Sequence, residues 1–313
     1  MYVASLPSTP MKTMLHRRKT ILLLVLGLAA CGVDDDSRTL NRDDAGQTDA
    51  STDASTSTDT ATDDMADAGF DVAQEDTGTP IVCLPNNDDV IERSEVPVAA
   101  DLRATFKIAT DATFDTRGTT DAGITTWDLS GELNNDGLEI VELKSLDGKW
   151  FEGTFPTALY YSKISTTSEL LGVFGATDSA LNLLGVVSAE DGFTKTELTY
   201  SPAVAALKFP LSESSNWTTD TSVSGTASGI ASLYTEKYTS VYAGSGKLIT
   251  PYGTFNVIRI RTNLERTLGF LVTKIKTYSF VAECFGTVAV IRSKDNETAV
   301  EFTTAAEIRR LAP

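Results

Sequence analysis

The chain has 313 residues, 22% of them charged, and a formal net charge of -17. Nucleic acids and anionic lipid headgroups are bound through basic patches, so this acidic balance argues against both as partners. The sequence contains one histidine, His16, in a segment that we expect to be removed. Histidine-based catalytic triads and histidine-ligated metal sites are therefore not expected in the mature protein, and no cofactor is predicted.

The N-terminus carries a basic cluster at residues 16–19 followed by an apolar run at residues 21–30. This order is typical of a secretory signal peptide. The run is about half of the roughly 20 residues that a membrane-spanning helix needs. We therefore expect residues 1–30 to be a signal peptide. Met11 or Met14 would give a leader of more usual length, so the true start codon stays open.

The leader ends in Leu28-Ala29-Ala30-Cys31, which resembles the lipobox of bacterial lipoprotein signals. The resemblance implies cleavage before Cys31 and transfer of diacylglycerol to its thiol, so that the membrane is a partner through the lipid anchor. Stable anchoring needs at least two membrane-binding signals, and this modification supplies several acyl chains on one residue. Gly32 follows where aspartate would resemble the inner-membrane retention signal of enteric bacteria. We therefore expect a cell-envelope protein at the outer membrane, with the face left open.

Residues 31–80 consist of the lipidated cysteine and a segment rich in Asp, Thr, Ser, Ala and Gly. Large apolar residues are too rare there to offset the entropy of ordering the chain, which predicts a disordered acidic tether. About 50 residues could reach roughly 165 Å when extended. The average span of a flexible chain of that length is nearer 40 Å.

Residues 81–313 are expected to form a single β-rich domain, because they alternate strand-forming residues with turn signals. With Cys31 lipidated, Cys83 and Cys284 remain, and two thiols in an oxidising compartment favour a disulfide. A loop of about 200 residues closed in this way gives roughly 5 kcal/mol as an upper figure. Two segments, residues 124–129 and 138–143, are predicted to pair as a hairpin around the turn at residues 134–137.

The C-terminal part predicts a meander of strands. Tyr234, Tyr238 and Tyr242 share one strand face, glycines interrupt that strand at residues 244–246, and a turn at residues 251–254 leads into residues 255–261. Further strands are expected at residues 270–281, as one long strand or a bent pair, and at 286–292 and 299–303. Residues 305–311 are open between a short helix and a last strand. The resulting fold class is mainly β, with one antiparallel, strongly curved sheet or a partly closed barrel.

The segment Leu207-Lys208-Phe209-Pro210-Leu211, with Trp217 and the turn at residues 251–255, resembles uncharacterised bacterial envelope proteins with a PL…W…P-x-G-T-F pattern. Their curved sheets are similar to the half-barrels of periplasmic lipoprotein carriers. The resemblance covers about a third of the chain and implies a fold, but it carries no catalytic positions.

Aromatic residues are the best functional clue, since they could line a ligand cavity inside a curled sheet. The alternative is that they are ordinary core residues or cross-strand pairs. The candidate residues are Tyr160, Tyr161, Trp217, Tyr234, Tyr238 and Tyr242.

Other motifs match known sites only in part. Lys247 follows a glycine pair as in a phosphate loop, but Leu248 stands where Ser or Thr must bind magnesium. Asp136 lies in a segment similar to a calcium loop, whose twelfth position is Leu143. Glu139 and Glu142 could act as paired carboxylates, although a regular strand places them on opposite faces.

These observations predict a lipid-anchored envelope protein that is not an enzyme. Its expected role is to bind an apolar or amphiphilic ligand or another envelope protein. A carboxylate-based hydrolase and a structural module for surface display are the alternatives.

Overall fold

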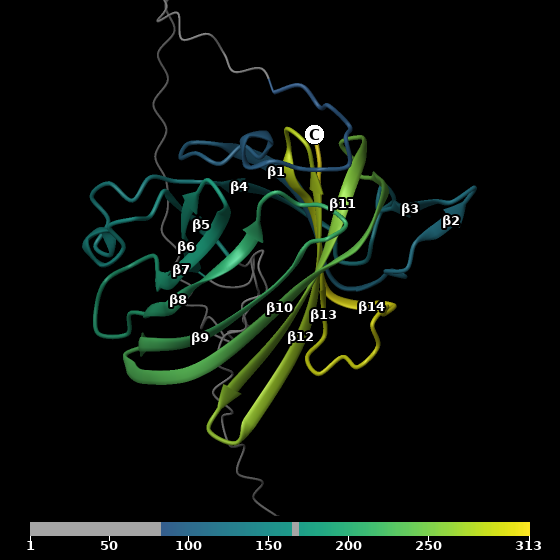
Figure 1. Ribbon diagram of the computed structural model, residues 1–313. Helices are drawn as coiled ribbons and strands as arrows, with labels where there is room; N and C mark the ends of the chain where they lie inside the picture. Colours follow the sequence, from purple (N-terminus) through teal and green to yellow (C-terminus); the bar gives the residue numbers. More distant parts are fainter. Residues whose placement is uncertain (1–82, 165–168) are drawn as a thin grey trace, which may run out of the picture. The chain divides into compact units, whose positions relative to one another are not determined.

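The computed structural model describes residues 83–164 and 169–313. The predicted signal peptide, the lipidation site Cys31 and the whole tether lie outside the described residues. From Pro85 onward the described residues belong to one compact unit. It contains one sheet of 14 strands (Figure 1). Helix among the described residues is limited to the two 3-10 turns η1 (Arg93–Glu95) and η2 (Glu152–Thr154).

The strands follow one another along the chain and most are joined by short turns. The first seven are β1 (Arg103–Thr113), β2 (Thr119–Asp121), β3 (Ile124–Asp128), β4 (Gly137–Glu142), β5 (Tyr160–Lys163), β6 (Leu170–Thr177) and β7 (Ala180–Ser188). The last seven are β8 (Glu197–Lys208), β9 (Asn216–Ala227), β10 (Ile230–Ile249), β11 (Thr254–Leu268), β12 (Leu271–Ala282), β13 (Gly286–Ser293) and β14 (Thr304–Leu311).

The main path of the sheet runs β4-β1-β14-β13-β12-β11-β10-β9-β8-β7-β6-β5. Every pair along this path is antiparallel. The sheet curls until its two edge strands, β4 and β5, approach each other, which leaves one incompletely paired seam. Just after β4, Lys144 and Tyr161 of β5 exchange backbone hydrogen bonds of 2.8 and 2.9 Å. The prediction of one antiparallel, strongly curved and partly closed sheet is confirmed.

Strict alternation of buried and exposed residues builds the strands of the meander. In β9, Trp217, Thr219, Thr221 and Val223 are buried while the residues between them are exposed. This is the two-residue period of a strand with one covered face. β11 is buried on both faces along much of its length, and it contributes side chains to three of the four hydrophobic clusters of the domain. The core is therefore arranged around β11.

The hairpin predicted for residues 124–143 is wrong. β3 pairs in parallel with β10, while β4 pairs with β1. The connection between β3 and β4 is held by Arg310 of β14, whose side chain binds the carbonyl oxygens of Leu129 and Gly131. Those contacts direct the two strands to different neighbours, and Asn134–Gly137 is not a hairpin turn.

The meander agrees with the prediction except near its end. β10 is a single strand whose register shifts between Tyr242 and Ser245, at the predicted interruption. The strand predicted at residues 299–303 is wrong. Phe302 O accepts from the backbone of Thr116 and Phe302 N donates to Thr116 Oγ1, in the loop after β1, so this segment does not enter the sheet. Residues 305–311 take the strand alternative, in β14. Cys83 and Cys284 are disulfide-bonded, as predicted.

Candidate functional site

The six aromatic residues predicted to line a cavity are distributed over the domain instead of facing one space. Tyr234 and Tyr238 lie together in one core cluster. Trp217 and the half-buried Tyr242 belong to a second cluster, and Tyr161 belongs to a third. Tyr160 stacks on Phe174, with ring centroids 5.1 Å apart. Lys149 Nζ lies 5.8 Å from the ring centroid of Tyr161, whereas Tyr234 and Tyr238 share a buried environment with an ion pair.

That environment is an ion pair inside the sheet. Glu236 on β10 accepts hydrogen bonds from Arg266 Nε at 2.6 Å and from Tyr238 Oη at 2.6 Å. The side chains of Glu236 and Arg266 are 0% and 5% exposed. Arg266 also lies over the ring of Tyr234, 5.2 Å from its centroid. The Glu236 carboxylate thus joins Arg266 and Tyr238 in the middle of an apolar cluster. We call Tyr200, Tyr234, Glu236, Tyr238 and Arg266 the interior polar cluster.

Burial governs the protonation of this cluster. It raises the pKa of Tyr200 and of Tyr238 well above the usual value, and it raises the pKa of Tyr234 to about 12. Desolvation alone would lower the pKa of Arg266, but the adjacent Glu236 carboxylate and the three tyrosines together outweigh it, and the pKa is raised. The tyrosines are therefore neutral and the arginine is charged at any physiological pH.

Sequence reasoning missed Glu236 and Arg266 although a signal for the glutamate was present. Tyr234, Glu236 and Tyr238 are separated by two residues each, so a regular strand puts the carboxylate on the same face as the two tyrosines. A charge on an aromatic face requires a buried partner. The partner itself could not be identified, because it depends on the register of β10 against β11, which pairs Glu236 with Arg266.

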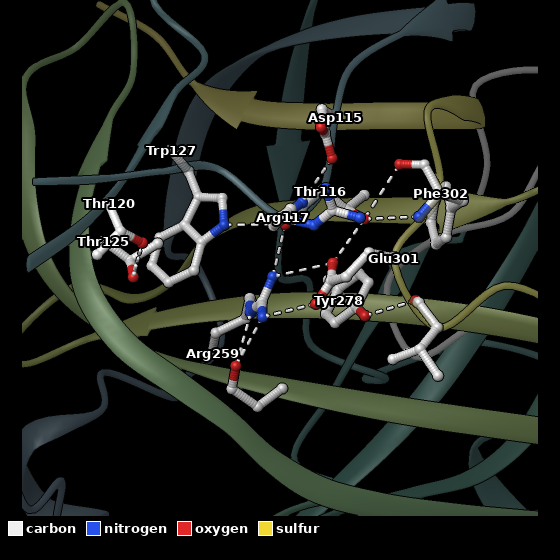
Figure 2. Close-up of polar contacts among 12 residues, drawn as sticks. Asp115, Thr116, Arg117, Thr120, Thr125, Trp127, Arg259, Tyr278, Glu301 and Phe302 are labelled. Carbon is white, nitrogen blue, oxygen red and sulfur yellow. Dashed lines mark hydrogen bonds and ion pairs between the residues drawn. The ribbon is translucent and has the colours of Figure 1, made fainter.

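A second arginine, Arg259, is held between two aromatic rings (Figure 2). Its guanidinium lies 4.7 Å from the ring centroid of Trp127 and 4.5 Å from that of Tyr278. It donates to the carbonyl oxygens of Ala243 at 2.7 Å and Thr116 at 2.6 Å, and to Glu301 at 3.0 Å. These groups converge from β3, β10, β11, β12 and two loops (Figure 2). The arrangement joins distant segments and leaves no room for a ligand at the guanidinium.

Asp136, in the segment similar to a calcium loop, has a structural partner. It binds Arg310 through two hydrogen bonds of 2.6 and 2.8 Å, and it accepts a third from the backbone of Leu133. Burial alone would raise the pKa of Asp136, but these hydrogen bonds and the arginine charge lower it instead. The carboxylate is thus committed to holding the connection between β3 and β4.

The predicted carboxylate pair, Glu139 and Glu142, lies on the edge strand β4. Glu142 forms an ion pair with Lys144 at 2.6 Å, and Glu139 lies 3.8 Å from Lys163 across the seam. The two glutamates have different cationic partners, so they do not form one shared acidic site.

A cavity of about 310 Å³ lies where the N-terminal segment of the domain passes β10 and β11. Asn87 crosses it, donating from its backbone to Glu283 at 3.0 Å and accepting from Asn256 at 2.9 Å. None of the six predicted aromatic residues lines it. Its lining combines polar and apolar groups: Asn87, Asp89, Ile91, Gly123, Ile124, Ser245, Gly246, Lys247, Asn256, Val257, Ile258 and Glu283.

Exposed apolar side chains gather at one end of the sheet, on three connections: β7 to β8, β9 to β10 and β11 to β12. Phe193 and Phe270 are exposed to 102% and 107% of the reference values for these side chains. We call this group the tip surface; its residues are Phe193, Ile230, Leu233, Phe270, Leu271 and Val272.

Backbone contacts and strand register place these three connections at the same end. Gly229 and Ser228, in the β9–β10 turn, donate backbone hydrogen bonds to Lys195 O and Thr196 Oγ1 in the β7–β8 connection, both at 3.0 Å. The ladder between β10 and β11 extends to Thr235 opposite Thr267, so the β9–β10 and β11–β12 turns leave the same end of the sheet. In Figure 1 the β9–β10 turn lies at the left of the domain and the β11–β12 turn at its bottom.

Comparisons with known proteins add little. No protein-family model matches the chain, and no curated protein matches it. One solved structure, a candidate lipoprotein from Parabacteroides distasonis, is similar over 68% of this chain and 95% of its own, with 7% identity and a TM-score of 0.30. A likeness at this level carries no inference about this chain.

In the part of the chain described by the structure, no helix has the length and apolar character needed to cross a membrane.

Proposed function

We propose that this protein is a lipid-anchored component of a bacterial cell envelope that works as a non-catalytic binding module. Its binding site is the tip surface, and the partner is apolar or amphiphilic. The observation that carries the proposal is the concentration of large exposed apolar side chains on three neighbouring connections. Single exposed apolar residues are normal on a soluble protein, whereas a contiguous group of them is typical of an interaction site.

The packing inside the sheet supports an external binding site over an internal one. The two tyrosines that share the interior polar cluster contact Glu236 and Arg266 instead of a vacant space. Trp217 donates its indole N–H to the carbonyl oxygen of Ala205 at 3.0 Å, so this candidate residue also has a partner within the core. The apolar area that a partner could contact therefore lies outside the sheet interior, and the tip surface gathers six exposed apolar side chains.

Lipid anchoring is tested by labelling the full chain with an alkyne analogue of palmitate in a bacterium that lipidates exported proteins. The wild type is expected to carry the label, and Cys31→Ser is expected to carry none. A wild-type chain that is exported but unlabelled would overturn the anchor.

Binding at the tip surface is tested by placing a photo-crosslinking amino acid at position 270 of the full chain in intact cells. The control position is Ile140, an exposed apolar residue on the edge strand β4. Crosslinks to lipid or protein are expected from position 270 and not from position 140. Equal yields from both positions, or none from position 270, would overturn the assignment of the binding site.

A further inference from the structure

We infer that the tip surface inserts into the headgroup region of a lipid bilayer, so that the domain contacts a membrane at the tip surface as well as through its anchor. This inference rests on the proposed function, because it names the partner of the same surface.

The three connections share a sequence and backbone pattern. In each of them a glycine with positive φ comes immediately before an exposed large apolar residue: Gly192 before Phe193, Gly229 before Ile230, and Gly269 before Phe270. Positive φ is the region that glycine adopts without steric cost. The chain thus reverses at the glycine and presents the next side chain outward. This pairing of a glycine with an exposed apolar residue occurs three times at one end of the sheet. The repetition indicates that these side chains form a functional surface.

Charge is absent from the sequence around two of the three connections, the short turns β9–β10 and β11–β12. Residues 221–235 and 267–273 contain no Asp, Glu, Lys or Arg, although 22% of the chain is charged. The β7–β8 connection differs, because Glu190, Asp191 and Lys195 lie near Phe193. The absence of charge around the other two turns lowers the cost of moving them out of water, because charged groups are the most expensive to desolvate.

The shape of the tip surface favours a bilayer over a protein partner. Phe193 and Phe270 protrude from the ends of their connections and are fully exposed. Protruding side chains need a partner with matching pockets if that partner is a folded protein, but a fluid bilayer closes around them without a preformed shape. Shallow insertion of apolar groups from a surface-bound protein is the interfacial mode of membrane association.

The sequence also places the domain within reach of a membrane. The described domain begins beside the β12–β13 turn, where the backbone of Asn87 binds Glu283 at 3.0 Å. Leu271 lies at the opposite end of β12, which has 12 residues and therefore spans about 40 Å. The predicted tether of about 50 residues can extend to roughly 165 Å, enough for the tip surface to turn toward the membrane that holds the anchor.

The test uses the mature chain, residues 31–313, produced with Cys31→Ser so that no acyl chain is present. Binding to phosphatidylcholine vesicles is measured by co-sedimentation and by the fluorescence of a Phe270→Trp variant. We expect binding, a blue shift in the emission of the introduced indole, and weaker binding when phosphatidylglycerol is added, because the chain is acidic. Phe193→Ser with Phe270→Ser should weaken partitioning at least about tenfold, the scale expected from removing two buried aromatic side chains.

The matched control is Leu138→Ser with Ile140→Ser, which removes two exposed apolar side chains from β4. It should bind vesicles as well as the unmodified chain, and circular dichroism should show that both double variants are folded. Absence of vesicle binding, or equal loss in the two double variants, would overturn the inference. A concentration-dependent dimer that the tip variant abolishes, without vesicle binding, would assign the surface to a second copy of the chain.

These outcomes are separable from those of the proposed function. Protein crosslinks from position 270 together with absent vesicle binding would keep a binding module and reject the bilayer as its partner. A chain that binds vesicles through the tip surface but is never acylated at Cys31 would reject the lipid anchor alone.

Discussion

Glu236 and Arg266 face each other on neighbouring strands, with Glu236 Oε1 2.6 Å from Arg266 Nε and both side chains almost completely buried. Breaking such a pair leaves an uncompensated charge in an apolar environment. We therefore expect Glu236→Gln to lower the free energy of unfolding by about 3–5 kcal/mol. Urea denaturation followed by circular dichroism measures this change.

The control is Glu265→Gln, one residue before Arg266. Glu265 forms an ion pair with Lys274 at 2.8 Å, but both side chains are about half exposed. Exposed pairs contribute roughly 0–1 kcal/mol, because water screens them and the side chains lose entropy. If the two variants lose similar stability, the buried pair does not have the role assigned to it.

The interior tyrosines should make the domain sensitive to alkali. Burial raises the pKa of Tyr234 to about 12, whereas an unfolded tyrosine titrates near 10. Between these values the folded chain binds more protons than the unfolded chain, so stability falls as pH rises. Urea denaturation at about pH 9 and about pH 11 should show this fall, and Tyr234→Phe should reduce it.

Tyr252→Phe is the matched control for removal of a tyrosine hydroxyl, because Tyr252 is exposed. It should leave the free energy of unfolding nearly unchanged. The prediction fails if the phenolate absorbance of the folded chain shows Tyr234 ionising together with the exposed tyrosines, since burial would then not protect its hydroxyl.

Local patterns in the sequence predicted the strands of the meander well. They did not predict distant strand pairing or the partners of charged residues. The alternation in β9 and the glycine interruption in β10 are local signals, so they could be read directly. The parallel pairing of β3 with β10 joins residues more than 100 positions apart, and no local pattern encodes it. The Asp-Gly sequence at residues 136–137 suggested a turn, but Asp136 is used to bind Arg310. Local turn propensity was overridden there by a tertiary contact.

In the candidate site, too, local sequence signals were predictable and tertiary contacts were not. Even spacing placed Tyr234 and Tyr238 on one face, but it could not separate them from Tyr242, which lies beside the register shift and packs in another cluster. The tip surface was not predicted, because Phe193 and Phe270 are indistinguishable in sequence from core residues. Their exposure depends on where the connections end in three dimensions.

Arg259 should not be replaceable by lysine. Its guanidinium forms hydrogen bonds in several directions while lying between Trp127 and Tyr278. A lysine ammonium lacks the planar group that makes both kinds of contact. We expect Arg259→Lys to cost on the order of 2–3 kcal/mol, the scale of a lost hydrogen bond to a charged group. The midpoint of thermal unfolding measures it, with the exposed Arg117→Lys as a control that should change little.

Gly229 is required for two reasons that a pair of variants can separate. Its φ is +79°, and a Cβ at this position would overlap the carbonyl oxygen of Phe193. Gly123 has a similar φ of +83° but no atom within 4 Å of the same position. Alanine at Gly123 should therefore cost only the roughly 1–2 kcal/mol of a left-handed residue. Alanine at Gly229 should cost more in urea denaturation, because the β7–β8 loop must also move. Equal losses would mean that the two connections do not pack as closely as their backbone contacts indicate.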